Sequence, residues 1–360
     1  MLWGMNGSGK TTLLKILHSA LLGDATQILR MDFDSAEVVV STNSGIETRT
    51  ITAASMEELD RVRNVSRTHI YNDRTFEQMR LYREAEALTW ASTRGDIRAI
   101  PHRYLPISRL SDASSVRGER APSAIKEILD ESEFDRLFAW HIQRTWEQHQ
   151  LSAERRVRVA QQNSITEILR TVLDPTTDVP PTPAGFSSGD AEQLLMSFFE
   201  GQAGFRHTVR QLDIAGQFQS NEQFQRVVAT VLAIQGRLKA AEEPEQRFIE
   251  SVDSVLGPRK RLNTAERRLM VSSTKSIGGA SIPLEALSSG EKQILRILLE
   301  TLVAGDSPVI VDEPELSLHV DWQARLLTAM RFVNPEAQII VASHAPEIVG
   351  DRSASRVSEV

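Results

Sequence analysis

The feature that most constrains the fold of this chain is a short apolar run that ends in two adjacent carboxylates. Val309, Ile310 and Val311 are followed directly by Asp312 and Glu313. An uninterrupted apolar run of this kind is typical of a parallel strand that is covered on both faces. Open α/β sheets bind ligands at the carboxyl ends of such strands. The run therefore predicts an α/β fold with the acidic groups of a site at one sheet edge.

A glycine-rich segment near the amino terminus has the spacing of a phosphate-binding loop. Glycines allow successive backbone N–H groups to curl around phosphates, and a helix that begins at Lys10 points its positive end at the same anion. In this pattern Lys10 reaches the β- and γ-phosphates, and the Thr11 hydroxyl is a ligand of Mg²⁺. The alternative is an ordinary glycine turn before an amphipathic helix. We expect the phosphates to be bound by Gly4, Asn6, Gly7, Ser8, Gly9, Lys10, Thr11 and Thr12.

The segments on either side of this loop differ in how clearly they can be interpreted. After the loop, apolar residues recur at helical spacing, which predicts a helix that ends at Gly23. Before it, a buried strand is expected, but only Met1, Leu2 and Trp3 precede Gly4. Either this strand is very short or the chain lacks its natural beginning, and the sequence leaves both explanations open.

The two carboxylates after the apolar run have separate expected roles. Asp312 is predicted to hold Mg²⁺ through a water molecule. Glu313 is predicted to polarise the attacking water as a general base, a role typically worth about 10²–10⁴ in rate. A solvated acidic loop is the alternative, but it does not explain why the acids follow a buried strand.

Two further motifs flank the carboxylate pair. Upstream, Ser289 and Gly290 open a helix predicted to run to about Val303, and its free N–H groups together with a serine hydroxyl form an anion site. Downstream, His344 follows an apolar strand at 338–342, so it is expected at the same sheet edge as Asp312. Taken singly, the first motif is a common helix cap and the second is a structural histidine.

The four motifs in this order resemble those of ABC-type ATPases, whose signature motif is similar to Leu287-Ser288-Ser289-Gly290-Glu291. The resemblance implies ATP and Mg²⁺ as cofactors, and a head-to-tail homodimer with ATP at the interface. Ser289 and Gly290 would then contact the γ-phosphate held by the other subunit. His344 would be a catalytic residue beside Glu313 and Lys10, because it would hydrogen-bond the γ-phosphate and orient the water. Residues 315–319 occupy the place of the loop that links the two sites.

Membrane-transporter ATPases are a poor match, because their phosphate loop and signature lie much closer together. The stretch from Pro314 to His319 and the residues after His344 instead resemble the ATPases of OLD-family nucleases, RecF, and subunits of bacterial anti-phage systems such as PtuA and AriA. Pro106-Ile107-Ser108-Arg109 is similar to a segment of that group, so Arg109 is expected to bind nucleotide. An ordinary exit from a strand is the alternative for Arg109.

The predicted fold class is α/β: a P-loop ABC-type ATPase head with an antiparallel β portion and a large helical insertion. Residues 1–110 and 263–360 are expected to form the split ATPase domain, and 111–262 the mostly helical insertion. Alternating patterns predict a hairpin from strands 36–41 and 46–52 and a later strand at 268–273. Helical spacing predicts helices within 57–95, 123–173 and the stretch up to 256, with a proline-rich linker at 174–189.

Composition limits the partners of the chain. Its 360 residues have a formal net charge of −7, contain no cysteine and include no apolar run long enough to span a membrane. A cytoplasmic protein without disulfides or membrane contacts is therefore expected. Basic clusters at 155–158, 259–261 and 267–268 are solvated helix faces or, alternatively, a nucleic-acid patch.

Three hypotheses follow. Sixteen residues after His344 leave no room for a nuclease domain, and no His-Asn-His nuclease pattern occurs, so the leading hypothesis is a dimeric ATPase switch in anti-phage defence. It would control a separately encoded effector, a nuclease or toxin, by family analogy, and the dimer could assemble into a higher oligomer. The second is a RecF- or SMC-like DNA-maintenance ATPase that binds nucleic acid itself. The third is an oligomerisation scaffold that turns ATP over slowly.

Overall fold

The computed structural model describes residues 1–5, 7–28, 31, 33–42, 44–52, 89–106, 131–174, 176–199, 213–265, 267–274, 280–350 and 358–359. Two of the expected nucleotide-binding residues, Asn6 and Arg109, lie outside these ranges. So do the residues at 57–88 and 123–130, for which helices were expected.

A five-stranded parallel sheet forms the centre of the head. Its order is β11 (Ser358–Glu359), β1 (Leu2–Trp3), β10 (Ile339–Ser343), β9 (Val309–Asp312) and β5 (Arg103–Leu105). All four residues of β9 are buried, as its uninterrupted apolar sequence predicted. The strand that enters the phosphate loop, β1, spans two residues in this chain.

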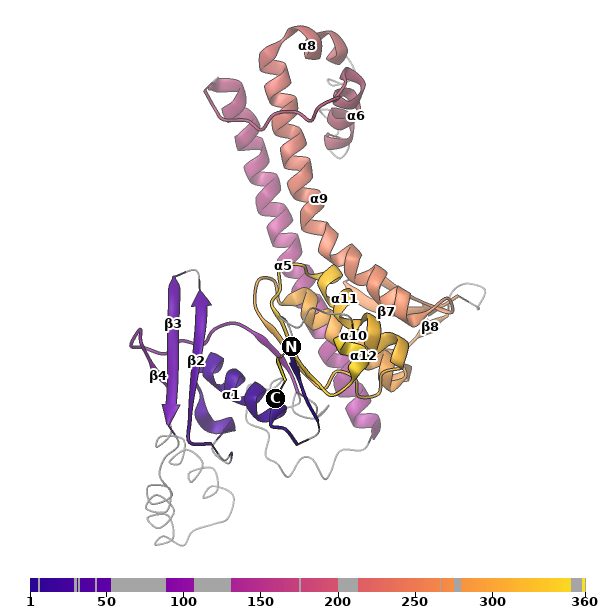
Figure 1. Ribbon diagram of the computed structural model, residues 1–360. Helices are drawn as coiled ribbons and strands as arrows, with labels where there is room; N and C mark the ends of the chain where they lie inside the picture. Colours follow the sequence, from indigo (N-terminus) through magenta and orange to yellow (C-terminus); the bar gives the residue numbers. More distant parts are fainter. Residues whose placement is uncertain are drawn as a thin grey trace, which may run out of the picture.

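Helices cover both faces of this sheet (Figure 1). On one face lies α1 (Lys10–Leu22), whose Leu14 and Leu21 pack against Ile310 of β9 and Ala342 of β10. On the other face, α10 (Ser289–Val303) and α11 (Val320–Val333) pack against the alternate strand residues, including Val311. Because successive side chains of a strand point to opposite faces, α1 and α10 lie on opposite sides of the sheet.

An antiparallel sheet of β2 (Ser35–Thr42), β3 (Gly45–Thr52) and β4 (Ala91–Ser92) flanks α1. The predicted hairpin is confirmed, with every residue of β2 paired to β3. The buried guanidinium of Arg49 ties this sheet to α1: it donates to the backbone oxygens of Ala20 and Leu21 at the helix end and pairs with Glu47 at 2.6 Å. The helical expectation for 57–95 is wrong at 91–92, because these residues hydrogen-bond to β3 as an edge strand.

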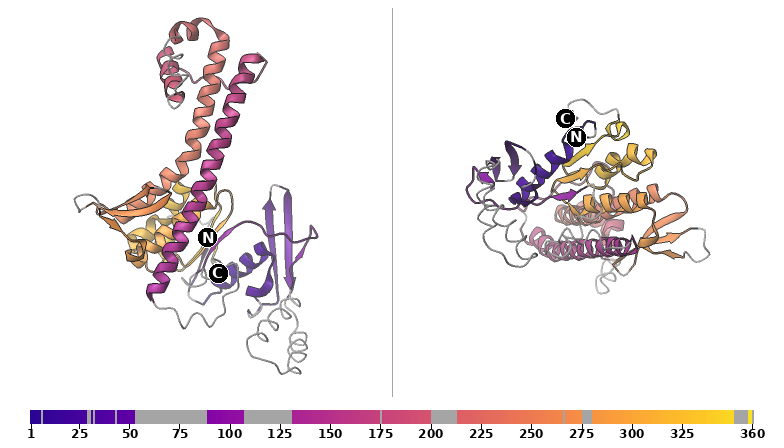
Figure 2. Two further views of the ribbon diagram at one scale, coloured as in Figure 1. Left: turned by 180° about the vertical axis from the view of Figure 1, so that it is seen from behind. Right: turned by 90° about the horizontal axis from the view of Figure 1, so that it is seen from below.

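Two long antiparallel helices, α5 (Glu131–Leu173) and α9 (Glu222–Leu256), project from the head as an arm (Figure 1). Two short helices, α6 (Ser188–Phe198) and α8 (Ile214–Ser220), pack at its tip around a small apolar core. The arm and its tip stand clear of the head in opposite views (Figure 2). The root of the arm, in contrast, is part of the head. Trp146 and Phe248 are fully buried there, in the same core as α10 and β9.

The chain returns from the arm through a second antiparallel sheet of β6 (Lys260–Ala265), β7 (Arg268–Ser273) and β8 (Ser281–Ile282). The strand predicted at 268–273 is confirmed. Single turns at η1 (Ala25–Gln27) and η3 (Leu284–Ala286), and the short α12 (Pro346–Val349), complete the described elements. The division at 110/111 and 262/263 stays a prediction.

Candidate functional site

Three of the four motifs leave the parallel sheet at one edge. The register places Leu2 of β1 beside Ala342 of β10, and Ala342 beside Asp312 of β9. Because these strands are parallel, the phosphate loop, the two carboxylates and Ser343-His344 all follow carboxyl ends that lie next to one another. The sheet thus brings together residues that are more than 300 positions apart in the chain.

The phosphate loop has the backbone that its glycines were expected to provide. Gly7 and Gly9 have φ values of 87° and 93°, a left-handed conformation that side chains rarely adopt. Gly9 is also the N-cap of α1, so the N–H groups of the first helical turn face the loop. The hydroxyl oxygen of Ser8 is buried there without a hydrogen bond.

Lys10 curls back over the loop. Its ammonium group donates to the backbone oxygens of Gly4 and Met5, each at 2.8 Å, and its side chain is almost fully buried. Two neutral carbonyl groups do not balance a buried positive charge. An anion seated in the loop would supply the missing countercharge.

Thr11 and Asp312 form the clearest contact of the site, with the Thr11 hydroxyl donating to Oδ1 of Asp312 at 3.2 Å. Asp312 is 2% exposed, and its Oδ2 has no hydrogen-bond partner. The pKa of Asp312 is raised to about 6, mainly by burial; the charges of Glu313 and Glu315 act in the same direction, and the Thr11 hydrogen bond and Lys15 act against them.

These two side chains fit a hard divalent cation. A buried carboxylate with a free oxygen and a raised pKa is stabilised by a nearby positive charge. Mg²⁺ is bound through one or two protein oxygens and keeps several waters and phosphate oxygens as its other ligands. Among the described residues, no three or more histidine, aspartate or glutamate side chains are arranged so that they could hold a metal ion by themselves.

Glu313 and His344 face each other across the same edge. Nδ1 of His344 lies 3.8 Å from Oε1 of Glu313 and 3.0 Å from Oε1 of Glu315, but it is buried and not aligned for a hydrogen bond with either oxygen. Glu313 has a φ of 46°, which is uncommon for a residue with a Cβ and marks functional sites more often than others. Its N–H donates to the oxygen of Ala342 at 2.8 Å, so neighbouring strand ends hold it in place.

Glu315, which the sequence analysis placed only within the loop that links the two sites, is a functional candidate in its own right. Its Oε1 accepts hydrogen bonds from the Ser343 hydroxyl at 2.7 Å and from the backbone N–H groups of His344 at 2.7 Å and Ala345 at 3.2 Å. The carboxylate therefore holds the segment that carries His344. Two features of the sequence could have indicated this role. An acid lies three residues after the buried strand β9, and a Ser-His pair lies at the end of the next strand, β10.

The signature segment forms a strongly capped helix start. Ser288, rather than Ser289, is the N-cap of α10, and it exchanges capping-box hydrogen bonds with Glu291. Glu291 in turn pairs with Lys260 at 2.7 Å. The Ser288 hydroxyl is thus used within the helix, α10 begins at Ser289 as expected, and a contact between the Ser289 hydroxyl and an anion stays a prediction. Ser289 is left exposed at the first helical position.

The signature does not complete the site within one chain. It begins a helix on the face of the sheet opposite α1 (Figure 2). Among the described residues, no hydrogen bond or ion pair joins Ser289 or Gly290 to the phosphate loop. The fold thus separates the signature residues Ser289 and Gly290 from the phosphate loop and the carboxylate pair, although the sequence analysis assigned all of them to nucleotide binding or catalysis.

Most of the basic clusters noted in the sequence are neutralised by partners in the chain. Lys260 pairs with Glu291, Arg261 with Asp253 at 3.2 Å, and Arg267 with Glu154 at 2.7 Å. These residues connect the second antiparallel sheet to α10, α9 and α5. The clusters at 259–261 and 267–268 thus serve packing between elements more than they form a free basic surface.

Comparison with known proteins agrees with this site. The family model described as "AAA domain, putative AbiEii toxin, Type IV TA system" matches residues 203–350, which include the signature, the carboxylate pair and His344. The Septu protein PtuA of Bacillus thuringiensis is 30% identical over 89 residues, which are 21% of this chain and 22% of PtuA. The chain therefore spans less than a quarter of this relative in the match.

Solved structures of Smc heads are also similar to this chain. A head bound to the C-terminal winged-helix domain of ScpA matches at a TM-score of 0.37 and 12% identity, covering 96% of this chain and 82% of the other. A head with a coiled coil and joint from Pyrococcus yayanosii matches at 0.36 and 13%, covering 100% and 89%. These overall scores are low, so the fold assignment depends on the motifs and topology described above.

None of the described helices is both long and apolar enough to cross a membrane. The phosphate loop, the signature, the carboxylate pair and His344 follow one another along the chain in the order found in ABC-type ATPases, and three of them meet at one sheet edge. The family model covers the same carboxyl-terminal motifs. This chain therefore has the fold of an ABC-type ATPase head and resembles the ATPases of bacterial defence systems.

Proposed function

We propose that this protein binds and hydrolyses ATP as a dimeric switch subunit. The observation that carries the proposal is the convergence of Lys10, Thr11, Asp312, Glu313 and His344 at one sheet edge. These are the groups needed to hold phosphates, a cation and an attacking water. Within the described residues no second constellation of this kind occurs.

Each residue has a definite role in this proposal. The loop N–H groups and Lys10 bind the phosphates of ATP, for which Lys10 gives up its present carbonyl contacts. Thr11 and Asp312 hold Mg²⁺, which neutralises charge that develops on the phosphate oxygens. Glu313 accepts a proton from water, while His344 keeps Glu313 and the γ-phosphate aligned.

The second half of the site is proposed to come from another copy of the chain. Ser289 is exposed and begins a helix whose free N–H groups suit a phosphate, yet it lies across the sheet from the phosphate loop. A head-to-tail pair of heads would place the Ser289 and Gly290 of each copy against ATP held by its partner. Such a pair has two-fold symmetry and two equivalent sites.

The biological setting is proposed from the likeness to PtuA, described as a Septu protein. We place this chain in an anti-phage defence complex in the cytoplasm, where ATP turnover controls a separately encoded effector, which is a nuclease by family analogy. The arm is a suitable lever for such control, because α5 reaches α10 through pairs between Lys292 and Asp135 at 2.7 Å and between His141 and Glu300 at 2.9 Å. Higher oligomers built from the dimer are compatible with this arrangement.

ATP turnover by the purified chain tests the catalytic part of the proposal. Glu313→Gln should lower the turnover about 10²–10⁴-fold while ATP binding persists, because the base is lost and the phosphate contacts remain. Glu347→Gln, on an exposed position of α12, is the matched control and should keep full turnover. Equal turnover by wild type and Glu313→Gln would contradict the proposal.

The partner part of the proposal needs a separate experiment. The chain is expressed from its native gene neighbourhood with a tag, and the proteins that co-purify with it are identified. A stably bound nuclease-like or toxin-like protein is the expected result. A membrane-spanning partner would contradict the assignment even if ATP turnover were confirmed.

A further inference from the structure

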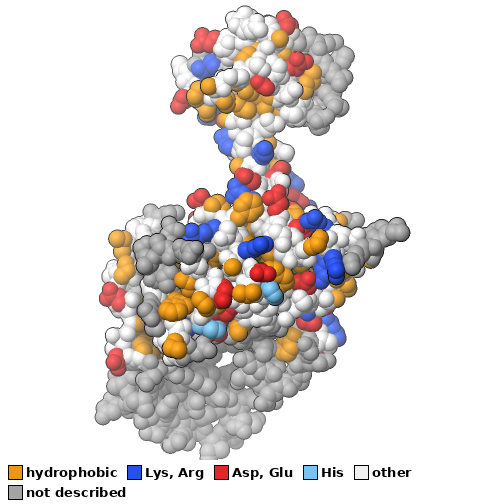
Figure 3. All heavy atoms as spheres, turned by 45° about the vertical axis from the view of Figure 1, so that its right-hand side comes forward, with side chains coloured by type: hydrophobic (Ala, Val, Ile, Leu, Met, Phe, Trp, Pro, Cys, Tyr) orange, Lys and Arg blue, Asp and Glu red, His pale blue; other side chains and the backbone are white. Residues whose placement is uncertain are grey.

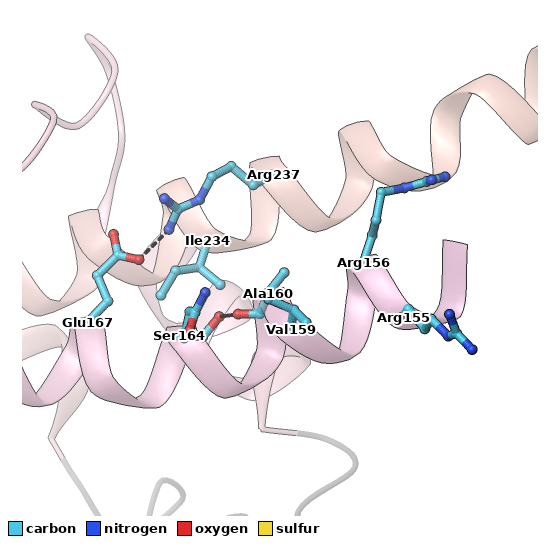
Figure 4. A pocket seen from close by; sticks show the side chains of 9 residues that line it. Arg155, Arg156, Val159, Ala160, Ser164, Glu167, Ile234 and Arg237 are labelled. Carbon is cyan, nitrogen blue, oxygen red and sulfur yellow. Dashed lines mark hydrogen bonds and ion pairs between the residues drawn. The ribbon is translucent and has the colours of Figure 1, made fainter. Parts of the chain in front are cut away.

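The arm contains a pocket of about 480 Å³ between its two long helices, well away from the phosphate loop. It is lined by Arg155, Arg156, Val159, Ala160, Asn163, Ser164 and Glu167 of α5, and by Ile234 and Arg237 of α9. Small molecules bind in pockets of about 300–1,000 Å³, so this volume suits a ligand of that class. Figure 4 shows Ile234, Ala160 and Arg237 between the two helices and Arg155 at the outer margin, on the side of α5 away from α9.

The pocket has a positive end and a neutralised end. Arg237 pairs with Glu167 at one end, and this pair closes the space between α9 and α5 (Figure 4). At the other end, Arg155 and Arg156 make no ion pair with any described residue. The acidic residue next to them in sequence, Glu154, is fully engaged by a two-pronged contact from Arg267 at 2.7 and 2.8 Å.

The charge at the positive end of the pocket also affects the pKa of a neighbouring histidine. The pKa of His149 is lowered to about 4, first by burial and second by the charge of Arg156. Basic and acidic side chains both lie along the stretch of the arm between the head and the tip on the face shown in Figure 3. Arg155 and Arg156 thus have no ion-pair partner among the described residues, and both are exposed.

Between the two ends the pocket is apolar. Ile234 is 1% exposed and forms the floor with Ala160, while Val159 is 55% exposed at the margin. The Ser164 hydroxyl already donates to the backbone oxygen of Ala160 at 2.6 Å, so its proton is not available to a ligand. Asn163 offers a donor and an acceptor beside this surface.

We propose that this arm pocket binds one nucleotide, with its phosphate on Arg155 and Arg156 and its base on the floor of Val159, Ala160 and Ile234. Arginine recognises phosphate through planar, two-pronged hydrogen bonds, and a base covers apolar surface with its face. A bare anion would use the arginines but leave the apolar floor uncovered. The nucleotide can be free or can be one unit of a nucleic-acid strand, since both offer the same phosphate and base.

Calorimetric titration of the full chain tests this inference. Lys10→Ala is introduced first, so that the phosphate loop contributes little and the result does not depend on ATP hydrolysis. The probes are AMP, GMP, CMP and UMP, short 5′-phosphorylated RNA and DNA strands, and inorganic phosphate. Saturable binding of at least one mononucleotide or strand is expected, with inorganic phosphate much weaker.

Matched variants assign the binding to the pocket. Arg155→Ala with Arg156→Ala should weaken binding about tenfold or more, because two charge-assisted contacts are lost. Arg158→Ala is the control, since Arg158 is exposed on the same helix but does not line the pocket. Val159→Asp should also weaken binding, because it places a negative charge at the edge of the apolar floor. Circular dichroism verifies that each variant keeps its helices.

The outcomes separate clearly. Binding of mononucleotides assigns the pocket to a free nucleotide, and binding of strands alone assigns it to nucleic acid; both support the inference. It is overturned if no probe binds, if the double arginine variant binds as tightly as the control, or if inorganic phosphate binds as well as every nucleotide.

Discussion

Gly290, the second residue of α10, packs directly against the backbone of Ser317. A Cβ added to Gly290 would lie 2.6 Å from the Ser317 carbonyl oxygen and 3.0 Å from the Trp322 ring. Ser317 itself has a left-handed φ of 68°, which few residues with a Cβ adopt. The start of the signature helix and the loop after the carboxylate pair therefore lie in direct contact.

The first prediction concerns this contact. Gly290→Ala should destabilise the fold by about 1–3 kcal/mol, because the new methyl group meets backbone that cannot move aside easily. Ser289→Ala, one residue earlier and exposed, should leave stability within about 0.5 kcal/mol. Urea denaturation followed by circular dichroism measures both variants. Equal stability of the two would show that the close approach is readily relieved.

A second prediction concerns Glu315, which holds the segment of His344. Glu315→Ala leaves the N–H of His344 and the Ser343 hydroxyl without their buried acceptor, so it should cost about 2 kcal/mol or more in stability. It should also slow ATP turnover by displacing His344. Glu315→Gln keeps an acceptor oxygen and should recover most of both losses. The proposed role is contradicted if Glu315→Ala and wild type hydrolyse ATP equally fast.

A third prediction concerns the root of the arm. Trp146 has no exposed surface and stacks on Phe248 at 5.6 Å between ring centres, within the core that also contains α10. Trp146→Ala should therefore destabilise the head itself by about 3–5 kcal/mol. Trp140→Ala, at a position 42% exposed on the same helix, is the control and should cost far less. A small effect at Trp146 would mean that the arm folds independently.

A fourth prediction concerns acid. Burial lowers the pKa of both His18 and His149 to about 4, from the ordinary value of 6.5. The unfolded chain then takes up protons before the folded chain does, so stability is complete above about pH 6.5 and falls as the pH drops toward 4. His149→Gln should flatten part of this decline. Denaturant titrations between about pH 7.5 and 5 measure it, and parallel curves for variant and wild type would contradict the assignment.

Local sequence patterns predicted the elements that carry the site. The apolar run before Asp312, the glycine spacing before Lys10 and the serine cap before α10 each depend on neighbours in the chain, so their strands and helices could be derived. The contact between Gly290 and Ser317 and the three bonds of Glu315 could not, because they join segments whose relative position only the folded sheet determines. The arm pocket was missed for the same reason: Arg155 and Arg237 lie 82 positions apart, and helical spacing alone does not show which faces meet.

The most direct test of the composite dimeric site mixes two inactive variants. Lys10→Ala disables the phosphate loop and Ser289→Arg blocks the signature, so each should be folded and nearly inactive alone. In a mixed dimer one site pairs the intact loop of one chain with the intact signature of the other. If subunits exchange freely, about a quarter of wild-type ATP turnover should return on mixing, because half the dimers are mixed and each has one working site of two. No gain over the sum of the separate variants, with subunit exchange verified, would contradict the shared site.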